Sequence, residues 1–263
     1  MLSNMRTLVT RQPSYSEGRG LELFCPVTWH QLTQEQLRYV LKLLVRNLDP
    51  VEVKIRVLCA FSGLRVRRKL QASYKCEIGS GRKRRIVYVQ AWQVQSLFDQ
   101  LGFIDRVEDT DVRLEIIGGC HAVDLYLHGM SFRDYLMCER FYQLFLIHRK
   151  DEFLDKLAAY LYVGDKDHWE LSPVERLGTF MWFTHVKKAL SENFRHLFQS
   201  GDESESYDLI ASMNAQIRAL TDGDVTREEQ VLNVDCWRAL TELDCKVRDA
   251  EAHERALRKM KNV

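Results

Sequence analysis

The sequence predicts an α+β fold that is predominantly α, with a small antiparallel β-hairpin element in the N-terminal half and a long C-terminal helix. Apolar residues recur at helical spacing over most of the chain. Between residues 72 and 90 this spacing changes to the alternation that is typical of strands. Only four prolines and 13 glycines occur among the 263 residues, which favours long regular elements.

The predicted organisation has four parts. Residues 1–20 hold little apolar content, so they are expected to be a flexible N-terminal arm. Residues 21–129 are expected to form an α+β domain with a basic hairpin, which begins with a short strand at 21–24. Residues 130–200 are expected to be a helical domain. Residues 201–263 are expected to be an acidic, serine-rich linker followed by the C-terminal helices.

Two helices are predicted early in the α+β domain. Thr33 and Gln36 have the spacing of a capping box, in which each side chain satisfies a backbone N–H group of the first turn. Asp49 and Pro50 are a capping residue and a proline at the first helical position. Each signal precedes an apolar stripe at helical spacing, and Gly63 is expected to end the second helix.

A β-hairpin is predicted next. Tyr74, Cys76 and Ile78 alternate with polar residues, glycines follow at 79 and 81, and 86–89 resume an apolar run.

The rest of this domain is expected to contain a helix at 91–102 and two short strands. The strands are expected at 111–117 and 123–127, with Gly118 and Gly119 as the turn between them.

Only helices are expected after Gly129. Ser131 is a capping residue, and Ser172, Pro173 and Glu175 repeat the combination of cap, proline and acidic residue that starts a helix. The expected helices cover about 131–148, 150–162, 173–196, 207–219 and 226–259.

Seven residues of the second half are the predicted partner-binding surface. Aromatic residues lie on several sides of the helix that follows Ser172, so this helix is either central in a bundle or partly exposed for a partner. The last helix has an imperfect heptad seam, which fits packing on its own domain as well as self-association in a coiled coil. The predicted surface comprises Trp182, Phe183, Phe194, Phe198, Leu240, Leu243 and Val247.

Two basic clusters are the alternative site. They can lie together as a patch for nucleic-acid phosphates, with Tyr74, Tyr88 and Trp92 near enough in sequence to stack on bases. A second interpretation is a hairpin tip that binds no ligand and is charged only to stay solvated. A third is a patch that binds an acidic protein. The clusters comprise Arg65, Arg67, Arg68 and Lys69 after the second helix and Arg82, Lys83, Arg84 and Arg85 at the hairpin tip.

The sequence contains no pattern that indicates an enzyme or a cofactor. It has no phosphate-binding glycine loop, no HExxH or GxSxG motif and no Cys/His set with zinc spacing. The seven cysteines are odd in number and include no CxxC pair, which favours a reducing compartment. The net charge is +1, and no run approaches the ~20 apolar residues of a membrane span. A cytoplasmic location with no membrane contact is therefore expected.

Six segments that together cover most of the chain in outline carry a family resemblance: 26–37, 130–135, 157–162, 172–199, 219–225 and 237–240. They resemble phage and prophage tail-assembly proteins, a tail-accessory, chaperone-like family encoded near the tail genes. The resemblance implies a small cytoplasmic protein of the host cell that binds phage tail structural proteins during assembly, and it supplies no active site to carry over.

The sequence thus favours a non-enzymatic, chaperone-like phage protein that buries a partner helix against residues 173–198 or against the terminal seam. A nucleic-acid-binding protein that uses the basic hairpin is the first alternative. An enzyme of unrecognised type is the second.

Overall fold

The computed structural model of the protein describes residues 8–10, 21–23, 25–79, 81–166, 169–198 and 209–261. The chain divides into two compact units, Met1–Val112 and Arg113–Val263. Helices predominate, and each unit adds a small three-stranded antiparallel sheet, so the predicted fold class is confirmed. The expected linker at 201–206 lies outside the described residues.

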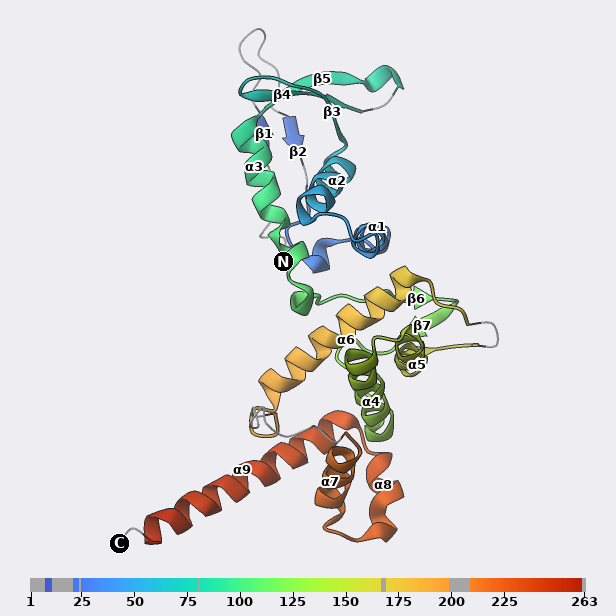
Figure 1. Cartoon of the computed structure of the whole chain (residues 1–263), viewed down its shortest axis with the longest axis vertical. Coiled ribbons are helices and arrows are strands. Elements are labelled where there is room, and N and C mark those ends of the chain that lie inside the picture. The colour runs from blue at the N-terminus through green and yellow to red at the C-terminus, as the bar shows by residue number, and fades with distance from the viewer. Residues whose placement is uncertain are drawn as a thin grey trace. The chain divides into compact units, whose positions relative to one another are not determined.

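Unit 1 combines helices with a three-stranded sheet of order β3-β4-β5 (Figure 1). Within the predicted N-terminal arm, a short strand, β1, pairs with β2. The rest of residues 1–20 lies outside the described part of the chain. The elements are β1 (Leu8–Thr10), β2 (Leu21–Leu23), α1 (Gln34–Val45), α2 (Pro50–Ser62), β3 (Leu64–Lys69), β4 (Ser73–Ile78), β5 (Arg85–Gln90) and α3 (Ala91–Gln100).

Local signals start and end the first two helices as expected. The Thr33 hydroxyl accepts from the Gln36 N–H at 3.2 Å, and the Gln36 side chain accepts from the Thr33 N–H at 2.9 Å. The Asp49 carboxylate accepts from the backbone N–H two residues later at 2.8 Å. Gly63 ends α2 with a φ of 71°, a left-handed conformation that glycine adopts without steric cost.

The sheet of unit 1 has one strand more than the predicted hairpin. β4 and β5 pair as expected, and β3 adds to the free edge of β4 with a register shift between Val66 and Arg68. The sequence did not predict β3, because this edge strand is rich in arginine and its basic face leaves no clear alternation of apolar and polar residues. Cys76, Val87 and Val89 are buried on the inner face of the sheet.

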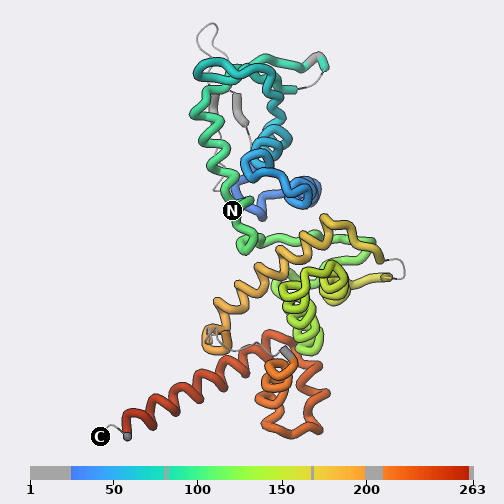
Figure 2. The backbone as a smooth tube through the Cα atoms, in the orientation of Figure 1, coloured from blue at the N-terminus to red at the C-terminus, as the bar shows by residue number. Residues whose placement is uncertain are grey.

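Unit 2 is built from helices and the sheet β6-β7-β8. Helices α4 and α5 pack against each other, and α5 packs on α6 (Figure 2). The elements are β6 (Ile116–Ile117), β7 (Cys120–Ala122), α4 (Phe132–His148), α5 (Asp151–Leu161), β8 (Tyr162–Val163), α6 (Pro173–Asn193), α7 (Leu209–Thr221), α8 (Glu228–Leu232) and α9 (Cys236–Lys261).

The small sheet of unit 2 differs from the two strands predicted from the sequence. Gly118 and Gly119 form the turn as expected, but β7 ends at Ala122, and residues 123–127 are not a strand. The reason is Asp124, whose carboxylate accepts from the Tyr126 and His128 N–H groups at 2.9 and 3.1 Å and so folds the chain into a turn.

The third strand of this sheet, β8, corrects the expectation that only helices follow Gly129. β8 directly follows α5 and pairs with β7. This pairing places β7 in the same unit as the helices, so the boundary between units comes before β6 and not after Gly129.

The predicted last helix is interrupted. Residues 225–232 form a 3-10 turn and the short helix α8, and α9 begins only at Cys236. At the break, the Phe132 N–H donates to the Val234 carbonyl at 2.8 Å, and the Cys236 N–H donates to the Met130 carbonyl at 2.9 Å. This pairing with the start of α4 replaces continuous helix, and the Asp235 carboxylate then accepts from the Trp237 N–H at 3.0 Å as a cap.

Candidate functional site

Two of the predicted partner-binding aromatics lie inside the core of unit 2. Trp182 is fully buried, and its indole N–H donates to the Leu125 carbonyl at 2.8 Å. Phe183 is fully buried beside Tyr142, with 5.3 Å between the ring centroids. Both residues therefore stabilise the fold and present no surface to a partner.

The other two aromatics follow the end of α6. Phe194 is buried, and its ring lies edge-on to Trp237 of α9 at 5.2 Å. Phe198 is half-buried, and the Lys187 ammonium lies 4.9 Å from its ring centroid. The Phe194 contact joins the segment after α6 to α9, whereas the Phe198 contact is with α6 itself.

The terminal seam is divided between core and surface. Leu240 and Leu243 are buried, and Val247 is half-buried. Further along α9, Glu254 and Leu257 are exposed. The first half of the seam thus packs on its own unit, as one of the two interpretations of the sequence proposed.

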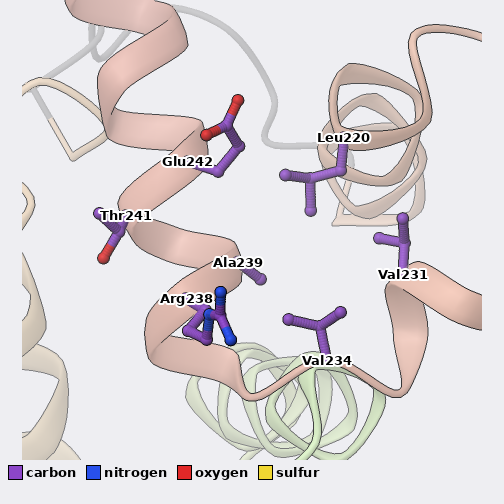
Figure 3. Close-up of a pocket in the computed structure, with 7 residues that line it drawn as sticks. All are labelled: Leu220, Val231, Val234, Arg238, Ala239, Thr241 and Glu242. Atoms are coloured by element: carbon purple, nitrogen blue, oxygen red, sulfur yellow. The ribbon is translucent and has the colours of Figure 1, made fainter.

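An open pocket lies between α7, α8 and the first turns of α9. Its volume is about 540 Å³. Figure 3 shows Leu220, Val231 and Val234 pointing into the space beside α9, where Ala239 completes the apolar lining. Arg238 and Glu242, both exposed, lie one helical turn apart on α9 at its rim, and Thr241 also contributes.

An ion pair fixes the helices that form this pocket. Lys246 of α9 donates to the Ala219 carbonyl at the end of α7 at 2.7 Å and to the Asp222 carboxylate at 2.6 Å. The hydrogen bond and charge of Lys246 lower the pKa of Asp222. Because the last carbonyls of a helix have no partner within it, this lysine also caps α7.

A second, smaller pocket, of about 330 Å³, lies near the C-terminal end of α7. It is lined by Asn214, Ile217, Arg218, Thr221, Gly223, Val225 and Glu228. The region of α7, α8 and the start of α9 thus offers two hollows to a ligand.

The two basic clusters of unit 1 meet at one acidic residue. Glu77 of β4 is only 3% exposed. The Arg67 guanidinium on β3 lies 2.6 Å from one carboxylate oxygen, and the Arg84 guanidinium at the hairpin tip lies 2.7 Å from the other. The hydrogen bond from Arg67 lowers the pKa of Glu77 most, with further lowering by the charges of Arg67, Arg84 and Arg65.

The remaining basic residues lie on the same elements. Arg65, Arg68 and Lys69 are exposed on β3, and Lys83 and Arg85 are exposed at the tip. The side chain of Arg82 lies outside the described part of the chain. The sequence predicts the first cluster after a helix, and it does not predict the strand β3 or the pairing of Glu77.

One signal in the sequence pointed to Glu77. Residues 64–98 contain nine basic side chains and a single acidic one, Glu77. A lone carboxylate at a strand position among so many cations is the natural centre of an ion-pair network.

The described residues contain no group of three or more His, Cys, Asp or Glu side chains that could hold a metal ion. All seven cysteines are free thiols. Burial raises the pKa of Cys25 to about 11 and that of Cys236 to about 12, so neither is a thiolate nucleophile near neutral pH.

Comparison of the chain with protein-family models, with curated proteins and with solved structures finds no match in any of the three. Among the described helices, none has both the length and the apolar character that crossing a bilayer requires.

Proposed function

We propose that this chain is a non-enzymatic, chaperone-like protein that binds phage tail structural proteins during assembly in the host cytoplasm. The open pocket between α7, α8 and α9 is the observation that supports this proposal. Its occupant would be an amphipathic helix of a tail protein, with one or two apolar side chains inserted into the pocket.

The lining of the pocket suits such a helix. Leu220, Val231 and Val234 supply apolar walls that are only half-buried in the chain itself. Arg238 and Glu242 supply one charge of each sign at the rim, and these can pair with charges that flank the apolar face of the incoming helix.

The pocket includes residues of two of the segments on which the resemblance was based. Leu220 belongs to the similar segment 219–225, and Arg238 and Ala239 belong to the similar segment 237–240. The two segments lie on different helices and are brought together at the pocket.

The test is affinity purification of the tagged full-length protein from phage-producing cells, with nuclease treatment and moderate salt, followed by quantitative mass spectrometry. Tail structural proteins are expected to be enriched. Val231→Glu places a carboxylate in the apolar wall, so at least about a tenfold loss of these proteins is expected. Glu242→Lys reverses a rim charge and is also expected to reduce their recovery.

The matched control for Glu242→Lys is Asp249→Lys. It makes the same change from a negative to a positive charge, at an exposed position of α9 that does not line the pocket. It is expected to recover tail proteins as the unaltered chain does. Thermal melts establish that each variant is folded. Equal recovery by the pocket variants and the control would exclude the pocket. Loss of the tail proteins after nuclease treatment, with recovery of nucleic acid, would contradict the proposal that the protein acts in tail assembly.

A further inference from the structure

The three-stranded sheet of unit 1 concentrates positive charge in a chain that is otherwise balanced. Residues 64–98 hold nine basic side chains against one acidic side chain, whereas the whole chain has a net charge of +1. Such a concentration on one small sheet produces a positive potential that attracts anionic ligands.

Strand register shows which of these charges share a face. Residues that are directly opposite each other in antiparallel strands point to the same side of the sheet. Arg65 pairs with Glu77, which pairs with Ile86, and Arg68 pairs with Lys75, which pairs with Tyr88. These six residues therefore form the outer face, opposite the buried face of Cys76, Val87 and Val89.

Glu77 neutralises only part of this outer face. Its carboxylate pairs with Arg67 and Arg84. Within the described residues, Arg65, Arg68 and Lys75 form no ion pair at 4.0 Å or less. Arg65 and Arg68 are also exposed, so their guanidinium groups can reach an external anion, although the charge of Arg65 also acts on Glu77 at longer range.

An aromatic ring lies among these cations. Tyr88 is 38% exposed, and Ile86 beside it on β5 is 42% exposed. Trp92, two residues after the end of β5, is 65% exposed. An exposed ring next to cations that can bind phosphate is the feature by which proteins hold unpaired bases and their backbone, and Tyr88 beside Lys75 meets this description.

We propose that the outer face of β3, β4 and β5 binds single-stranded nucleic acid, with Arg65, Arg68 and Lys75 on the phosphates and Tyr88 stacked on a base. A single strand is favoured over a duplex because stacking on Tyr88 requires an unpaired base. It is favoured over an acidic protein because an acidic protein would use the cations and leave the exposed ring without a role. This site is separate from the pocket of unit 2.

The direct test is fluorescence anisotropy of the full-length protein with a labelled oligothymidine of about 15 nucleotides. This length is near the largest number of nucleotides that a single OB fold, a common single-strand-binding domain, covers. Binding is expected to weaken steeply with salt. Replacing Arg65→Ala and Arg68→Ala together is expected to reduce the slope of log affinity against log salt by about 1.4, or about 0.7 for each phosphate that the protein no longer neutralises.

Two changes at Tyr88 test the stacking interaction. Tyr88→Leu keeps an apolar side chain but removes the ring, so affinity is expected to fall about fivefold or more. Tyr88→Phe keeps the ring and is expected to bind like the unaltered chain. The matched control for charge is Arg255→Ala with Arg258→Ala, which removes two exposed arginines from α9 in unit 2.

Duplex DNA and polyglutamate serve as competitors. The proposal requires that unlabelled oligothymidine displaces the probe much better than either of them. It is overturned if the oligothymidine does not bind, or if the control pair weakens binding as much as the Arg65 and Arg68 pair. It is also overturned if polyglutamate competes equally and Tyr88→Leu has no effect, which would indicate an acidic protein ligand.

Discussion

Two guanidinium groups converge on the carboxylate of Glu77, one from β3 and one from the hairpin tip. A buried carboxylate is tolerated only when it is paired and hydrogen-bonded. Here Arg67 donates a hydrogen bond to one oxygen at 2.8 Å, and Arg84 forms an ion pair with the other. The backbone at the tip helps to bring Arg84 to it. Gly79 has a φ of 85°, and a Cβ atom there would lie 2.7 Å from the Lys83 carbonyl oxygen, so only glycine fits.

The charge of Glu77 is therefore expected to stabilise unit 1 in a pH-dependent way. The pKa of Glu77 is lowered from its ordinary value of 4.5, chiefly by the hydrogen bond from Arg67. A carboxyl group whose pKa is lower in the folded state stabilises the fold above the ordinary value, and this contribution is lost as pH falls through the lowered pKa. Glu77→Gln should lower the melting temperature at neutral pH, with a difference that shrinks below pH 4.5.

Thermal melts of both proteins across this range measure the effect. The control is Glu254→Gln, an exposed carboxylate on α9 whose removal is expected to change little. If the difference in melting temperature between Glu77→Gln and the unaltered chain stays constant as the pH falls below 4.5, the ion-pair interpretation is contradicted.

Among the helices and strands, the starts of helices were predicted best, because local sequence signals determine them. The capping residues Thr33, Asp49, Ser131 and Ser172 each begin a helix at the expected place, because the hydrogen bonds of a cap lie within a few residues. Two short strands were missed for different reasons. β3 pairs with the next strand, β4, but its basic residues leave no apolar alternation, whereas β8 exists only through pairing with the distant strand β7.

The cap of α6 is expected to contribute measurably to stability, because this helix carries the buried aromatics of unit 2. The Ser172 N–H donates to the Glu175 carboxylate at 2.9 Å, and the Ser172 hydroxyl accepts from the Glu175 N–H at 3.4 Å. Ser172→Ala should lower the free energy of unfolding by about 1 kcal/mol. Urea unfolding measures this. Ser191→Ala, at an exposed position of the last turn of the same helix, should change it by less than about 0.5 kcal/mol. Equal effects of the two changes would show that the capping box does not stabilise α6.

At the scale of the whole molecule, the candidate sites come from segments that are far apart in the chain. The pocket of unit 2 is lined by residues of three helices, among them Leu220, Val231 and Ala239, so no local sequence motif could predict it. Of the predicted aromatic surface, Trp182, Phe183 and Phe194 are buried, because helical spacing alone does not distinguish a buried stripe from an exposed one. The basic face was recognisable because its charges cluster within one short stretch of sequence.

The full chain is expected to be monomeric, because its terminal seam is largely used within unit 2. Cys236, Leu240 and Leu243 are buried in one chain, and the exposed remainder contains Glu254 with only Leu257 as a large apolar seam residue. A stable coiled coil needs apolar seam positions over three or four heptads, which this remainder does not supply. Sedimentation equilibrium should therefore give the mass of one chain, 30.9 kDa, for the unaltered protein and for Leu257→Asp. A dimer mass that falls to that of one chain in Leu257→Asp would instead show that the distal half of α9 joins two copies.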